Sequence, residues 1–428
     1  MDALLKVVQY ILNLGPTVIL PLTITIMGIC FKLGFKKSFK SGITIGVGFV
    51  GINLVIGLLT ENLGAATSMM VTRYGLHLSV LDVGWPAAAA ISWASPIAAI
   101  MIPIAMLVNV VLLFLKFTNV VDIDIWNYWH FTAAGATVLV LTNGNWGLAI
   151  LAAIIYEIAV LKIADWTAPM VEDFFGLEGV SLPTGSTAAC GLIGIPVAKV
   201  IGMIPGIKNM KADPESIQKR FGVFGEPMMM GLVLGVLIGF LAGYDIGKCV
   251  QLGIIMAGVM FLMPRMVKIL MEGLIPISEG VREFLQKTNF GKDRKLTIGL
   301  DAAVAVGHPA VIATALVLVP ITLFLAVVLP GNKVLPFGDL TTICFYVAFI
   351  VGSTKGNIIH SVLSGTVVMA LALLMATNIA GFHTQIAQMA QFKMPAGTTM
   401  ISSLDLGGNF LNWIIVKVFQ VFTGGFIF

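Results

Sequence analysis

The sequence has few charged residues. Of its 428 residues, 11% are charged and 58% are hydrophobic, and the mean hydropathy is +0.99. A soluble globular protein has about 25% charged residues, so this composition excludes a chain that folds in water alone. Apolar runs of about 20 residues recur along the sequence, which is the length of helix that crosses a bilayer core of about 30 Å. The composition therefore predicts an all-α, polytopic membrane protein.

Motifs for independent chemistry are also missing. The sequence has no Walker A loop and no dinucleotide-binding glycine fingerprint, so we expect neither ATP hydrolysis nor a nucleotide cofactor. The four cysteines, Cys30, Cys190, Cys249 and Cys344, lie far apart and follow no metal-binding or redox spacing. The net charge of +4 gives no sign of a nucleic-acid partner. We expect no cofactor and no metal, and an enzyme of lipid-linked substrates is the least favoured class.

The apolar runs divide the chain into spans. The first residues lack the basic start and the small-residue cleavage site of a signal peptide, so we interpret them as part of the first span. Polar breaks then predict eleven transmembrane helices, near residues 7–31, 41–60, 96–115, 122–142, 147–163, 226–243, 249–264, 310–329, 335–352, 358–380 and 411–428. The polar stretch 381–410, with His383 and Gln385, is expected to be extracellular and solvated.

Basic residues gather in three of the segments between spans. Segments 32–40, 208–220 and 265–295 contain more than half of all the lysines and arginines. Because cytoplasmic loops carry the excess of basic residues in membrane proteins, we expect all three segments to be cytoplasmic. The amino terminus is then predicted to lie outside.

Two stretches of the chain resemble each other. Residues 80–112 and 299–329 both begin with a Leu-Asp pair, continue through a Gly-aromatic-Pro step, and enter an apolar run with an internal Pro-Ile. The proline of that pair is followed 19 residues later by an aspartate in both stretches, Asp122 and Asp339. With the orientation above, the sequence predicts two inverted repeats, which is the architecture of many secondary transporters.

The repeat predicts how the chain is divided. We expect one membrane domain over 7–428, made of a first repeat at 1–163 and a second at 226–380. Residues 164–225 would form a re-entrant hairpin and a cytoplasmic loop, and 381–428 the extracellular segment with the last span. Within 177–194, Thr184 and Ser186 lie between apolar arms, which favours a re-entrant hairpin over a tight cytoplasmic turn.

Aspartates inside the apolar runs mark the candidate binding site. A carboxylate near the membrane centre costs about 3 kcal/mol or more, yet Asp82 and Asp301 lie in the interrupted segments 79–95 and 297–309. Interrupted segments at matching places in two repeats point to a binding site near the midplane. We expect both aspartates to face a polar cavity, and the alternative is that each caps a half-helix.

Further candidate residues surround these two aspartates. Trp85 and His308 belong to the Gly-aromatic-Pro steps, and His130 lies inside a span where it could donate to a hydroxylated ligand or be a satisfied core histidine. Asp339 lies at the start of a predicted span, as Asp122 does, and its role is equally open. Glu226 begins a helix, where the macrodipole favours an anion, so a structural role is its default interpretation.

A series of motifs resembles one family. DVGWP (82–86), WAS (93–95), DIWNYWH (124–130), LEG (177–179), FGVFGEP (221–227), GLD with VGH (299–308) and LPFGDLTT (335–342) occur in this order. Together they resemble the galactitol-type permeases, the membrane IIC components of the bacterial sugar phosphotransferase system. The similarity runs from about residue 7 to the end, and a more distant kinship with the ascorbate permeases follows.

The resemblance implies a fold and partners. It implies an eleven-span homodimer in the bacterial cytoplasmic membrane, with a transport core and a scaffold built from inverted repeats. A separate IIB protein, supplied by IIA, would phosphorylate the sugar from a phosphocysteine, so the chain itself would not be the enzyme. The resemblance places ligand contacts near Asp82, His130, Thr184 and Asp301. The hairpin sequence PTGST departs from the relatives, which often have a histidine near this point.

The function that follows is elevator-type transport. The core would carry galactitol, or a related hexitol or hexose, between the Asp82 and Asp301 segments, and Asp301 or His308 could orient the hydroxyl that is phosphorylated. An ion-coupled sugar symporter without phosphorylation is the alternative that the repeats and buried aspartates leave open.

Overall fold

The structure is a computed structural model that describes residues 16–30, 32–74, 78–122, 124–207, 222, 226–287, 296–395 and 398–423. The start of the first predicted span, the basic segment 208–220 and most of the FGVFGEP motif lie outside the described residues.

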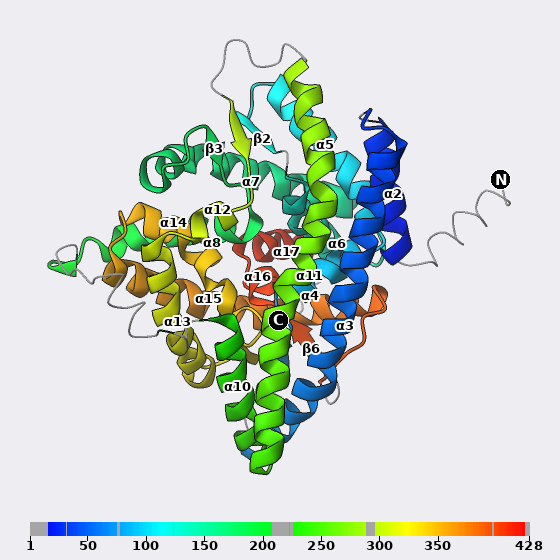
Figure 1. Ribbon diagram of the computed structural model, residues 1–428. Coiled ribbons are helices and arrows are strands. Elements are labelled where there is room, and N and C mark those ends of the chain that lie inside the picture. The colour runs from blue at the N-terminus through cyan, green and yellow to red at the C-terminus, as the bar shows by residue number, and fades with distance from the viewer. Residues whose placement is uncertain are drawn as a thin grey trace.

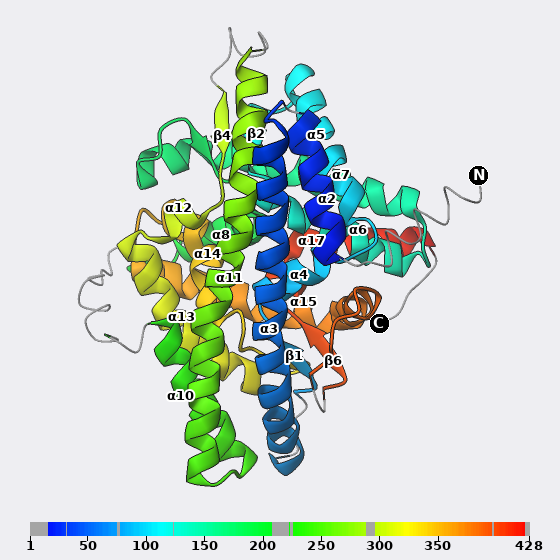
Figure 2. The same cartoon turned by 45° about the vertical axis from the view of Figure 1, so that its right-hand side comes forward.

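Two very long helices run through the molecule. Helix α3 (Phe35–Tyr74) has 40 residues and α11 (Ile246–Lys287) has 42. At a rise of 1.5 Å per residue each is about 60 Å long, roughly twice the bilayer core. They pack side by side and run in opposite directions, with α2 (Pro16–Cys30) and α10 (Pro227–Ala242) against them (Figures 1 and 2). We call these four the scaffold helices.

Glycines allow the scaffold helices to approach closely. A Cβ on Gly235 of α10 would lie 2.8 Å from both the Cα of Gly253 and the carbonyl oxygen of Leu252 on α11. On the other side of α11, a Cβ on Gly273 would lie 2.8 Å from the carbonyl oxygen of Ser41 on α3. Small residues at such contacts are typical of helix packing in lipid, where dispersion contacts replace the hydrophobic effect.

The rest of the described chain forms two runs of elements in the same order, except that the second run ends in two helices and the first in one. The first run is β1 (Val80–Asp82), α4 (Trp85–Trp93), α5 (Ala98–Phe114), β2 (Val120–Asp122), the 3-10 helix η1 (Ile125–Asn127), α6 (Tyr128–Leu141), α7 (Trp146–Phe175), β3 (Val180–Ser181) and α8 (Gly185–Ile201). The second is β4 (Thr297–Gly299), α12 (Ala303–Val306), α13 (Pro309–Val328), β5 (Val334–Leu335), the 3-10 helix η4 (Leu340–Thr342), α14 (Ile343–Ser353), α15 (Ile358–Met389), β6 (Met400–Ser402), α16 (Leu404–Gly407) and α17 (Phe410–Thr423).

Two small parallel sheets connect these runs. In one sheet the strand order is β5-β1-β6, and in the other it is β2-β4-β3. The first strand of each run therefore lies between the second and third strands of the other run. The register pairs Val80 with Val334 and Met400 in one sheet, and Ile298 with Val121 and Val180 in the other. Each sheet satisfies backbone groups that non-helical chain would otherwise leave without hydrogen bonds.

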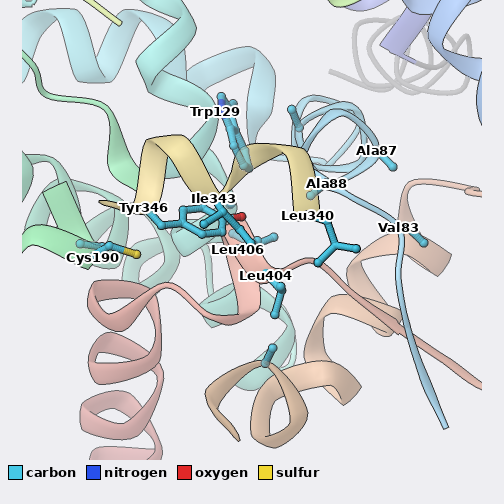
Figure 3. Close-up of a cluster of buried hydrophobic side chains, with 14 of the residues drawn as sticks. Val83, Ala87, Ala88, Trp129, Cys190, Leu340, Ile343, Tyr346, Leu404 and Leu406 are labelled. Carbon is cyan, nitrogen blue, oxygen red and sulfur yellow. The ribbon is translucent and has the colours of Figure 1, made fainter. Parts of the chain in front are cut away.

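The two runs also share one apolar core. Figure 3 shows a cluster in which Ala88 and Trp129 from the first run pack near Leu340, Tyr346 and Leu404 from the second. All of these side chains are buried.

Several described helices suit a bilayer. Three are long and apolar enough to cross it, namely α7, α13 and α15. Helices α4 and α5 form a bent pair with an angle of 94°, which could count as a fourth span, and five further apolar helices or helix segments have 10–17 residues. The break between α4 and α5, at residues 94–97, begins at the end of the interrupted segment expected at 79–95. A polytopic, mostly helical membrane protein is confirmed, and the count of eleven spans stays a prediction.

Two expected segments differ from the structure. Residues 265–287 are not a loop, because α11 continues to Lys287. The stretch 381–410 is not a solvated segment: α15 extends to Met389, and β6 and α16 follow it into the interior. His383 is only 4% exposed, whereas Gln385 is exposed as expected. The polar residues of this stretch misled the prediction because their side chains bond within the fold, as Thr384 does to the backbone of Ile401.

The close contact between α10 and α11 can be tested at Gly235. We expect Gly235→Val to lower the free energy of unfolding by about 1–3 kcal/mol, because a larger side chain overpacks the contact. The matched control is Gly258→Val on α11, where a Cβ would meet nothing within 4 Å. Thermal unfolding of the purified variants in detergent compares the two, and equal melting temperatures would contradict the close approach.

Candidate functional site

The Asp82 carboxylate is held entirely by backbone donors. It lies at the end of β1 with no exposed surface. Its Oδ1 accepts the N–H of Gly84 at 3.1 Å, and its Oδ2 accepts the N–H groups of Phe337 at 3.0 Å and Asp339 at 2.9 Å. Two of these three donors come from the other run of elements. This geometry is that of a cap on backbone groups, the alternative considered for Asp82.

Asp339, in the second run, accepts a backbone N–H from the first run, just as Asp82 accepts two from the second. Its Oδ1 accepts the backbone N–H of Trp85 at 2.6 Å. Its Oδ2 accepts the Ser403 hydroxyl at 2.6 Å and the N–H of Asp405 at 3.1 Å. The fully buried Asp339 thus joins α4 of the first run to α16 of the second.

The two runs are in backbone contact at this place. Gly84 has φ +82°, a conformation that favours glycine. A Cβ on Gly84 would lie 3.0 Å from the Cα of Gly338, and one on Gly338 would overlap the backbone of Gly84. The two glycines therefore allow the cross-connection between Asp82 and Asp339.

A second polar cluster surrounds Asp301. Its Oδ1 accepts the N–H of Ala303 at 2.8 Å, and its Oδ2 lies 3.3 Å from the Thr184 hydroxyl. Thr184, at the start of α8, accepts the N–H of Ala302 at 2.7 Å and lies 3.2 Å from Oδ1 of Asn127. The backbone N–H of Asp301 donates to Asp124, the N-cap of η1, at 3.2 Å. The segment that contains Thr184 and the second interrupted segment therefore meet, which brings Thr184 and Asp301 together.

Asp124 is the structural counterpart of Asp339. Each is the N-cap of a 3-10 helix, η1 or η4, and each accepts a backbone N–H from the opposite run. The 19-residue spacing instead pairs Asp339 with Asp122. The structure corrects this pairing, because Asp122 is still in β2, two residues before the cap.

His130 lies between the two clusters. Its Nε2 is 3.2 Å from Oδ1 of Asp405, whose backbone N–H binds Asp339. Its Nδ1 is buried and has no hydrogen-bond partner. The ring lies against Gly185, where any Cβ would overlap the imidazole, and against Trp129 at a centroid distance of 3.7 Å. Ser186 is buried beside it on α8.

Other predicted residues lie apart from the clusters. The half-buried Trp85 packs its ring edge-on to Trp126 at 5.9 Å, and only its backbone N–H reaches Asp339. His308 caps α13 through Nδ1 and packs against Phe174 at 4.6 Å. Glu226 is exposed at the start of α10, on the scaffold.

Sequence reasoning missed three buried residues of the site. Ser403 and Asp405 are described above, and Asn409 donates to the Tyr156 hydroxyl at 2.9 Å and to the carbonyl of Gly185 at 3.3 Å. They come from the stretch interpreted as extracellular. A signal was present, because Leu404-Asp405 repeats the Leu-Asp pairs of Asp82 and Asp301.

The clusters offer hydrogen-bonding groups of one chemical kind. They contain carboxylates, hydroxyls, an amide and an imidazole, and within the described residues no three His, Cys, Asp or Glu side chains gather to hold a metal ion. Carboxylates accept strong, charge-assisted hydrogen bonds from hydroxyl groups. Such a site suits a neutral ligand with many hydroxyls.

Comparisons with known proteins agree on one family. The model of the EIIC-GAT family, described as PTS system sugar-specific permease component, matches residues 10–397. The galactitol-specific EIIC component of the PTS system from Escherichia coli (strain K12) is 44% identical over 415 residues, covering 97% of this chain and 91% of the relative. The galactitol-specific EIIC component of Escherichia coli O157:H7 matches with the same identity and coverage.

The connection made by Asp339 can be tested by substitution. Asp339→Ala would remove the acceptor of the Trp85 N–H and of the Ser403 hydroxyl, and each such loss costs about 1–3 kcal/mol, whereas the N–H of Asp405 would keep the Ser403 hydroxyl as an acceptor. We expect the variant to lose most of its folded population, measured by thermal unfolding and size-exclusion chromatography in detergent. Asp173→Ala is the control, because that side chain is exposed near the end of α7. Wild-type melting of Asp339→Ala would contradict the assignment.

Proposed function

We propose a substrate and a transport mechanism on the premise that this chain belongs to the EIIC-GAT family of PTS sugar-specific permease components. It is the membrane permease subunit of a sugar phosphotransferase system, and the partner IIB carries out the phosphorylation. An ion-coupled symporter without phosphorylation is not favoured by this membership.

The substrate that we propose is galactitol. The observation that carries this choice is the 44% identity, over nearly the whole chain, to galactitol-specific EIIC components. The site is consistent with it, because a hexitol is uncharged and presents a row of hydroxyl groups. Buried carboxylates bind such hydroxyls more strongly than neutral acceptors do.

We assign the direct ligand contacts to Asp301, Thr184, Ser186 and His130. Asp301 is 8% exposed, whereas Asp82 and Asp339 have no exposed surface, and Ala303 and Val304 near it in the chain are exposed. The partnerless Nδ1 of His130 is a further group that could bind a hydroxyl. Asp301 would also orient the hydroxyl that is phosphorylated, since positioning dominates phosphoryl transfer.

The other predicted site residues receive supporting roles in this proposal. Asp82 and Asp339 would hold the binding segments in place, because backbone donors and Ser403 occupy their oxygens. Trp85 would contribute its ring to the sugar site. His308 and Glu226 would not touch the sugar, since one packs on Phe174 at the start of α13 and the other lies on the scaffold.

We further propose an elevator built from inverted repeats. The matching element order, the exchanged strands of the two sheets and the opposite directions of α3 and α11 support repeats of 16–207 and 226–423. We propose these bounds in place of the repeats 1–163 and 226–380 expected from the sequence. The reason is that β3 and α8 of the first run match β6 and the helices after it in the second. The scaffold helices would stay fixed while the remaining elements move as a transport core.

The membrane setting completes the proposal. We propose a homodimer in the bacterial cytoplasmic membrane, with the amino terminus outside and the basic α2–α3 turn inside. The outward face of α2 and α3 supports an apolar environment, lipid or a second copy, because Leu22, Ile26, Val47 and Leu54 are exposed there.

Binding measurements test the substrate and the role of Asp301. Radiolabelled galactitol should bind the purified wild type, and unlabelled galactitol should compete better than other hexitols or hexoses. Asp301→Asn should weaken binding by about tenfold or more, since a hydrogen bond to a charged group contributes about 1.5–3 kcal/mol. Glu226→Gln is the control and should bind normally. Unchanged affinity of Asp301→Asn would remove it from the site.

Cross-linking tests the movement of the core. Glu61 on α3 and Lys393, between α15 and β6, form an ion pair of 2.9 Å across the boundary between scaffold and core. A reducible bifunctional reagent that joins cysteines at these positions through two disulfides should stop galactitol uptake in vesicles supplied with phosphorylated IIB, and a reductant should restore it, since the ion pair links the ends of two long side chains. The exposed Cys30 is replaced in all variants.

The control cross-link lies within the scaffold. Nζ of Lys37 on α3 and Oε2 of Glu279 on α11 are 3.5 Å apart, so the same cross-link between cysteines at these positions should leave uptake intact. Uptake by fully cross-linked protein with the Glu61 and Lys393 pair would contradict the elevator.

A further inference from the structure

Glu157 is a buried acid that the proposed site does not use. It lies in the middle of α7 and is 1% exposed. Neither of its carboxylate oxygens has a hydrogen-bond partner. An ionised carboxylate in such surroundings is strongly unfavourable without a partner, so its presence needs a cause.

The charged neighbour of Glu157 is another acid. Glu157 interacts electrostatically with Asp122 at the end of β2, whose Oδ2 is also buried without a partner. Tyr128 of α6 interacts with both and donates its hydroxyl to the carbonyl of Asp122. Asp122 is further influenced by Asp124 and by Asp301 of the second run. No basic side chain is among the groups that face this pair within the described structure.

The fold itself does not require an acid at this position. Helices α7 and α15 are counterparts, and each begins at an asparagine N-cap, Asn145 or Asn357. Twelve residues after these caps lie Glu157 and Met369. Met369 is fully buried in the apolar core. The same place in the second run is therefore filled by an apolar side chain, so packing does not explain Glu157.

A chain of hydrogen bonds leads from this pair to the proposed sugar site. Nδ2 of Asn127 donates to Oδ1 of Asp122 at 2.9 Å. The Thr184 hydroxyl is 3.2 Å from Oδ1 of Asn127 and 3.3 Å from Oδ2 of Asp301. Because a hydroxyl has one hydrogen, the orientation of Asn127 decides to which of these two acceptors Thr184 donates.

We propose that Glu157 and Asp122 share one proton, and that this proton makes Glu157 a positioning residue for the Asp301 site. With the proton on Glu157, Asp122 carries the only charge of the pair and holds Asn127 in the orientation described. Removing the proton to water leaves two carboxylates that repel each other in a low dielectric. Asn127 and Thr184 would then shift, and sugar binding would weaken. The link to sugar binding rests on the proposed function, whereas the shared proton does not.

Infrared spectroscopy tests the shared proton without any sugar. The purified protein in lipid should show, at neutral pH, the carbonyl stretch of a protonated carboxylic acid. Glu157→Gln should weaken this band, and so should Glu157→Met, which copies the side chain of Met369 and serves if the first variant does not fold. Glu178→Gln should keep the band, because that carboxylate is exposed. A band unchanged in the Glu157 variants would overturn the proposal.

The pH dependence of galactitol binding tests the positioning role. Wild-type affinity should fall by about tenfold as the pH is raised through the titration of the pair, a size usual for coupled sites. The affinity of Glu157→Gln should change by less than about twofold over the same range. An identical pH profile in both proteins would overturn the role. If the wild type binds no galactitol, the substrate assignment fails while the infrared result still decides the shared proton.

Discussion

The rest of this structure depends on one kind of hydrogen bond. In it, an aspartate carboxylate accepts a backbone N–H from the opposite half of the chain. Trp85 donates to Asp339, Asp301 donates to Asp124, and Phe337 donates to Asp82. Within a bilayer no water can satisfy a broken helix, so each unpaired group would cost several kcal/mol. The carboxylates remove that cost, and the chain can leave helical geometry at membrane depth on both sides of the site.

The sheets and glycines make this exchange possible. Each central strand lies between two strands of the other run, which fixes the register at which the aspartates meet their donors. Gly84 and Gly338 then bring the two backbones into contact. The polar groups that remain after this bonding, such as Nδ1 of His130, are the ones available to a ligand. In the proposed function, the same polar residues hold the fold and bind the sugar, and the atoms that the backbone leaves without a partner are the ones assigned to the sugar.

The buried acids accordingly fall into two kinds. Both oxygens of Asp82 and Asp339 are occupied, mostly by backbone donors. Glu157 and Oδ2 of Asp122 have no donors at all. An acid of the first kind contributes to stability by giving buried backbone N–H groups a hydrogen-bond acceptor. An acid of the second kind must carry a proton or bind a ligand to be tolerated. Buried acids therefore serve two different purposes in one fold.

The sequence by itself determined the membrane class and the family, and it singled out Asp82, Thr184 and Asp301, which the structure buries. Hydropathy, motif order and an internal repeat are properties of neighbouring residues, and they can be read without a fold. The tertiary structure alone decided which acids are caps, that α11 continues through a basic stretch, and that Asp405 and His383 are buried. Those outcomes depend on contacts such as Trp85 with Asp339, 254 residues apart, and burial or bonding across such a separation leaves no local pattern in the chain.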